Sequence, residues 1–134
     1  MESLALIKAI LLASSAVTAA CEGGIHANEA PQRDPLPNVV IMSTGPNDDS
    51  DKLTHSGPNG LLNERVRIWA QAKTANAALA LGVAIDRALH GYSGNVSGAH
   101  VQLVEKLMTL SDFQSNATVQ RAIIDVRIHW TRAA

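Results

Sequence analysis

The sequence predicts an α+β fold: an antiparallel four-stranded sheet with two helices packed on one face, in the order α-β-β-α-β-β. Two segments repeat their apolar residues at helical spacing, which predicts the helices. Other segments alternate apolar with polar residues or form a β-branched run between turn residues, which predicts strands. With 134 residues, of which 46% are hydrophobic, the chain is large enough for one core and too small for two. We therefore expect a single domain over residues 1–134.

The opening segment MESLALIKAILLASSAVTAAC predicts the first helix. At about 100° per residue its large apolar side chains gather on one side, with Leu12 as the exception, while Glu2 and Lys8 fall on the other side. The apolar side holds Leu4, Ile7, Ile10, Leu11 and Val17.

An exported lipoprotein is the alternative interpretation of this segment. Ala19 and Ala20 before Cys21 resemble a lipobox, in which Cys21 would be the lipidated residue. Export segments, however, begin with a positive charge and continue with an uncharged apolar run. Here Glu2 precedes the apolar run and Lys8 interrupts it. The charge order favours a structural helix, and nowhere does the chain hold a charge-free apolar run of about 18 residues, the length that spans a membrane.

A surface connection is predicted at residues 21–38, which contain a glycine pair and three prolines. The β-branched run at residues 39–42 predicts a strand, because Pro37 stands before it and Gly45 and Pro46 follow it. Residues 45–60 have almost no apolar content and predict a long loop. The charged residues of this loop are Asp48, Asp49, Asp51 and Lys52.

The second half of the chain supplies the remaining elements. Residues 62–71 alternate cleanly and predict a second, half-buried strand. An Ala-rich helical stripe predicts a helix over residues 73–90, followed by a glycine-rich loop, YSGNVSG. Residues 100–113 fit either a helix or a strand, and periodicity alone does not decide between them. Residues 118–130 alternate most regularly and predict the last strand.

Composition and motif spacing do not point to an active site. With 11 Lys and Arg against 12 Asp and Glu, the formal charge is −1, and no basic excess indicates a nucleic-acid partner. The single cysteine cannot form an internal disulfide, and the five histidines are not spaced like metal ligands. The acidic residues near position 50 lack the glycine and the closing Glu of a calcium loop. We therefore expect no catalytic residue, no cofactor and no metal.

The alternation also predicts which side chains lie on the sheet face away from the helices. If the aliphatic residues of the two alternating strands face the helices, Trp69 and Ile123 lie on the opposite face among Arg65, Arg67, Asp125 and Arg127. Trp and Arg are enriched at protein contacts, but a mixed face of this kind is also a common solvated surface. We take Arg65, Arg67, Trp69 and Arg127, together with the four charged loop residues, as candidate interface residues.

The whole layout resembles the tail-completion, or tail-terminator, proteins of long-tailed bacteriophages and of phage-derived gene transfer agents. The resemblance rests on the Leu/Ala-rich first helix, GGIHANEAP leading into LPNVVIMS, the polar loop, RVRIWAQ, the Ala-rich helix that ends ALHG, and the closing strand RAIIDVRIHW. These blocks cover nearly the full length of the chain, although Asn38 stands where the family often has an aromatic residue. They are not an active-site signature.

The resemblance implies a structural virion assembly protein and not an enzyme. It implies that residues 100–110 form a strand, and that the protein forms a ring, usually a hexamer, that caps the tail tube and joins tail to head. The implied partners are the tail tube protein and a head-proximal connector or stopper protein, with DNA only as cargo passing the ring lumen and no membrane. The implied locations are the host cytoplasm during assembly and then the head-proximal end of the tail in the virion.

Overall fold

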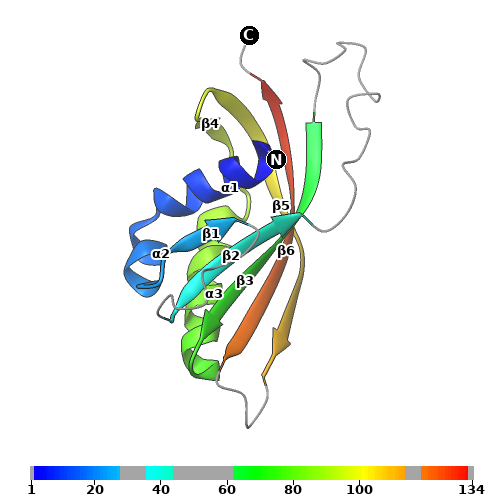
Figure 1. Ribbon diagram of the computed structural model, residues 1–134. Coiled ribbons are helices and arrows are strands. Elements are labelled where there is room, and N and C mark those ends of the chain that lie inside the picture. The colour runs from blue at the N-terminus through cyan, green and yellow to red at the C-terminus, as the bar shows by residue number, and fades with distance from the viewer. Residues whose placement is uncertain (1, 28–35, 44–61, 114–118, 133–134) are drawn as a thin grey trace.

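A computed structural model describes residues 2–27, 36–43, 62–113 and 119–132. It shows a strongly curled sheet with three helices lying against one face (Figure 1). The predicted loop at residues 45–60, with its four charged candidate residues Asp48, Asp49, Asp51 and Lys52, lies outside the described residues.

The described elements follow one another as three helices and six strands. In chain order they are α1 (Glu2–Leu12), α2 (Ser15–Ala20), β1 (Ile25–Ala27), β2 (Asn38–Ser43), β3 (Leu62–Ala72), α3 (Ala75–Leu89), β4 (Gly94–Val96), β5 (Ala99–Asp112) and β6 (Gln120–Arg132). Across the sheet the strands lie in the order β1-β2-β3-β6-β5-β4. Only β1 and β2 are parallel to each other, and the other neighbours are antiparallel.

The predicted four-stranded antiparallel sheet with two helices is therefore wrong, because the sheet is mixed and has six strands. The additional strands β1 and β4 are three residues long and lie in segments whose glycine and proline content predicted loops. A strand of three residues is too short to show a period of two, so alternation could not reveal it. Both are held by pairing with a longer neighbour, β1 with β2 and β4 with β5.

The amino-terminal segment forms two helices, which is the second correction to the fold. The break falls at Ala13 and Ser14, where the Ser14 side chain caps α2 by accepting a hydrogen bond from the Val17 backbone at 3.4 Å. The predicted apolar stripe is nevertheless confirmed, since all five of its residues are buried, and Leu12 is 53% exposed as the expected exception. No described helix has the length and apolar character needed to cross a membrane.

Residues 99–112 form the strand β5, and its geometry explains why the sequence left this segment undecided. The pairing of β5 with β6 shifts register between Val101 and Leu103, and again between Lys106 and Met108. Each bulge adds a residue and so moves the following side chains to the other face of the sheet. Val101 and Val104 therefore both face the helices, three residues apart, which imitates a helical spacing.

The core lies between the helices and one face of the sheet. Alternate residues of β3 and β6 are buried there against α1 and α3. The helix α3 approaches β6 closely at Gly82, where an added Cβ would lie 3.2 Å from the Ala122 Cβ. The start of α1 is attached to the end of β6, because the Trp130 indole donates a hydrogen bond to Ser3 Oγ at 3.0 Å. The amino-terminal helix is thus part of the core of this domain.

Candidate interaction surface

The sheet face opposite the helices, here called the open face, is organised in rows of side chains that lie directly opposite one another across the strands. One row is apolar and consists of Val40 on β2, Trp69 on β3, Ile123 on β6 and Leu110 on β5. Its exposure increases toward β5: Val40 is 3% exposed and Leu110 is 44% exposed. This apolar row is therefore uncovered mainly at its β5 end.

A second row is built around a buried carboxylate. Asp125 is fully buried and lies opposite Arg67 in the pairing of β3 with β6. It accepts hydrogen bonds from Arg67 Nε at 2.8 Å and Arg67 Nη2 at 3.0 Å, and a longer one from Arg65 Nη2 at 3.4 Å. These two cations hold the pKa of Asp125 below its usual value, and the hydrogen-bonded carboxylate raises the pKa of Arg67. The pairing fixes both guanidinium groups on the open face.

A third row connects four strands through polar contacts. Gln71 Nε2 donates to Asn38 Oδ1 at 2.9 Å, and Arg121 Nε donates to Gln71 Oε1 at 2.8 Å. Arg121 also lies 3.5 Å from a carboxylate oxygen of Asp112. The same guanidinium lies over the Trp69 ring, 5.5 Å from its centroid, which is within the range of a cation–π contact.

The four described candidate residues, Arg65, Arg67, Trp69 and Arg127, all lie on the open face. Arg65 and Arg127 are direct cross-strand neighbours, and Arg127 Nη1 donates to Asn63 Oδ1 at 2.8 Å. The Trp69 indole Nε1 is buried and has no hydrogen-bond partner among the described residues. Whether these residues contact another protein stays a prediction.

Two residues that organise this face were not among the candidates. Alternation already placed Asp125 on this face, but its pairing with Arg67 depends on the cross-strand register. Arg121, which covers the indole, is brought to Trp69 by the pairing of two strands about 50 residues apart in the chain. Cross-strand register is the signal that would have found both, and a single sequence does not contain it.

The described residues do not form a recognisable metal-binding or catalytic centre. Across 2–27, 36–43, 62–113 and 119–132, no three His, Cys, Asp or Glu side chains lie close enough together to bind a metal ion. His26 Nε2 lies 2.8 Å from the Gly23 carbonyl oxygen, and His129 lies 3.5 Å from Glu105. Cys21 is a free, buried thiol whose pKa is raised by burial. Its side chain belongs to the core, not to an exposed surface.

The fold is thus a curled sheet with helices on one face and rows of apolar, charged and polar side chains on the other. The family of tail completion proteins gp17 matches residues 5–131, and the chain belongs to this family. It is therefore a structural protein of tail assembly and not an enzyme, as the resemblance implied.

Two solved structures share the fold. A chain in the virion of a native gene transfer agent (GTA) particle is 19% identical, with a TM-score of 0.67, and the match covers 96% of this chain and 93% of that chain. The gp17 protein of bacteriophage SPP1 is 20% identical, with a TM-score of 0.51 over 95% of this chain and 89% of that chain. Among curated proteins, none matches the chain.

Proposed function

We propose that the protein assembles into a ring, a hexamer, that caps the tail tube and joins the tail to the head. The observation that supports this most is the match of the tail completion family to residues 5–131. The similarity of the fold to a chain of a gene transfer agent virion supports a place within such a particle. The protein would then assemble in the host cytoplasm and remain at the head-proximal end of the tail.

A capping ring acts through shape, since one of its faces must match the end of the tube and the other must bind the next component. Such a role needs side chains that are already fixed before contact, because ordering them on binding would cost free energy and weaken the contact. The open face has this property: Asp125 holds Arg65 and Arg67, and Arg121 bridges Gln71 and Asp112.

We assign the open face to contact with a neighbouring ring, formed by the tail tube protein or by the head-proximal connector or stopper. Arg65, Arg67, Trp69 and Arg127 are the proposed contact residues of the described part. Asp48, Asp49, Asp51 and Lys52 are proposed to add to the same function. DNA passes the lumen of this ring as cargo, and the formal charge of −1 does not favour tight binding of a polyanion.

Electron microscopy of particles produced with and without the gene tests this function. Without the protein we expect separate heads and unjoined tails, and complementation with the intact chain should restore joined particles. Joined particles of normal form in the absence of the protein would contradict the proposal.

A further inference from the structure

Exposed apolar side chains are concentrated at one edge of the molecule. Seven large hydrophobic residues are strongly exposed among the described residues, and six of them lie on α3 or on β5 and its end. These six are Leu79, Val83, Leu103, Met108, Leu110 and Phe113. Leu79 and Val83 lie on α3, whereas Leu103, Met108 and Leu110 pair with residues of the open face and lie on that side of the sheet. Exposed apolar patches mark sites of association.

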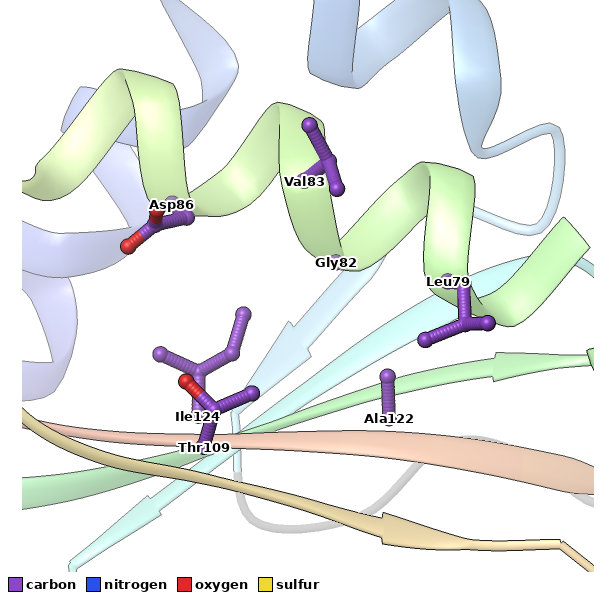
Figure 2. Close-up of a pocket in the computed structure, with 7 residues that line it drawn as sticks. All are labelled: Leu79, Gly82, Val83, Asp86, Thr109, Ala122 and Ile124. Carbon is purple, nitrogen blue, oxygen red and sulfur yellow. The ribbon is translucent and has the colours of Figure 1, made fainter. Parts of the chain in front are cut away.

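An apolar groove lies beside Leu79 and Val83, between α3 and the strands beneath it. Figure 2 shows Leu79, Gly82 and Val83 on the helix above Thr109, Ala122 and Ile124 of the sheet. Its volume is about 110 Å³, and its lining is mainly aliphatic, which suits an aliphatic side chain. Asp86 lines the same groove one helical turn from Val83, and its carboxylate lies 3.4 Å from Lys106 Nζ.

The strand that borders this groove has an open backbone edge. The outer side of β5 pairs with β4 through Val101, and Val104 exchanges backbone hydrogen bonds with Gly91 and Tyr92. From Glu105 to Asp112 no described strand pairs with the outer side. Eight residues span about 26 Å, and a sheet about 10 Å thick then offers roughly 260 Å² along this edge. A stable contact takes about 800 Å² from each partner, so a partner at this edge must also cover neighbouring surface, such as that of α3.

The seventh exposed hydrophobic residue, Leu12, ends α1 and is followed by α2, which packs on α3. Helix α1 starts at the β6 side of the sheet, where Ser3 binds Trp130, and it packs on α3 and on the strands β1, β2 and β3. Figure 1 shows α1 running across the sheet to the turn that leads into α2. Leu12 is the last residue of α1, and Lys8 lies one turn before it on the same helix face.

We propose that copies of this chain associate head to tail, with Leu12 of one copy in the groove between α3 and β5 of the next. The groove and Leu12 are two different patches of one subunit, and identical contacts between two such patches form a ring when the rotation from copy to copy closes. Lys8 of the incoming copy then lies near Asp86, whose contacts with Lys106 are long, at 3.4 and 3.5 Å. The apolar side chain and the charge beside it thus meet an apolar groove with an acidic end. This contact rests on the proposed ring, for which it names the subunit interface.

Thiol crosslinking of the full chain tests the geometry. The double variant Leu12→Cys with Val83→Cys is treated with a short bismaleimide, and each single variant is the control; the native Cys21 is buried. We expect a ladder of covalent oligomers from the double variant, up to the full ring, and no ladder from either single variant. Covalent dimers from the Val83→Cys variant alone would show a two-fold contact at the groove and overturn the proposal.

A charge substitution tests the contribution of the groove. Val83→Asp places an unpaired charge in the proposed contact, and self-association should weaken by roughly a hundredfold. Ala80→Asp is the matched control, because Ala80 is exposed on the same helix but does not line the groove, and its effect should stay within about threefold.

The outcomes separate this contact from the ring itself. A wild-type protein that stays monomeric contradicts both the ring and the contact. A wild-type ring that forms no Leu12 to Val83 crosslinks, or that tolerates Val83→Asp as well as Ala80→Asp, overturns the contact and leaves the ring standing.

Discussion

Removal of the Asp125 carboxylate should destabilise the fold and disorder the open face. Loss of one partner of a buried ion pair lowers the free energy of unfolding by about 3 to 5 kcal/mol. The partners Arg65 and Arg67 keep 42% and 32% of their side chains exposed, so water compensates for part of the loss. We expect about 2 to 3 kcal/mol for Asp125→Ala, which lowers the melting temperature by about 7 to 10 °C for a chain of this size.

The stabilisation of the fold by Asp125 should decrease as the pH falls into the acid range. The folded-state pKa of Asp125 lies below its unfolded value of about 3.9, so its ionised form stabilises the fold fully above that pH. This stabilisation is lost as the pH falls through the folded-state pKa. Asp125→Asn, which keeps the shape but cannot ionise, should therefore be less stable than the wild type at pH 7 by about 1 to 2 kcal/mol. The difference should shrink below about pH 4.

Urea unfolding at a series of pH values measures both effects. Asp112→Asn is the control, because that carboxylate is 42% exposed and 3.5 Å from Arg121, and we expect a change within about 0.5 kcal/mol. The reasoning fails if Asp125→Asn matches the wild type at pH 7, or if their difference does not depend on pH in the acid range.

Four further substitutions test other parts of the structure. Leu11→Asp places a charge in the core and should lower the free energy of unfolding by about 3 to 5 kcal/mol. Leu12→Asp, at a 53% exposed position, should change the stability of the monomer by less than about 1 kcal/mol. Equal melting temperatures for the two variants would contradict the placement of Leu11 in the core and Leu12 at the surface. Trp69→Ala should leave a folded protein that still self-associates but no longer attaches to a neighbouring ring. Sedimentation measures the self-association, and particle assembly measures the attachment. A lower melting temperature with attachment intact would show that the indole makes only contacts within its own chain. Gly82→Leu should destabilise by about 1 to 3 kcal/mol in denaturant unfolding, since even a Cβ there would lie 3.2 Å from Ala122, and an unchanged midpoint would show that α3 can shift.

The long elements could be predicted from the sequence because each buries one side along its whole length. The stripe through Leu4, Ile7 and Leu11 and the alternation around Val66 and Ile68 both appear in the structure at the expected positions. Periodicity of this kind is a direct consequence of one-sided burial, so it can be recognised in the sequence before the fold is known.

The short and irregular elements could not be predicted, because they depend on pairing with other strands and not on a local pattern. The strands β1 and β4 exist only through their partners, and the parallel pairing of Ile25 with Val39 has no local signal. The two bulges of β5 shift which side chains face the core, so the apolar spacing of this strand also fits a helix. The open face could be predicted only in its composition. Its organisation around Asp125 and Arg121 depends on the register between β3 and β6.

Native mass spectrometry of the purified chain tests most directly whether this protein forms a closed ring. We expect one assembly of fixed size, six copies of the 14.2 kDa chain, that does not grow as the concentration rises. A chain that stays monomeric at every concentration, or an open series of oligomers without a preferred size, would contradict it.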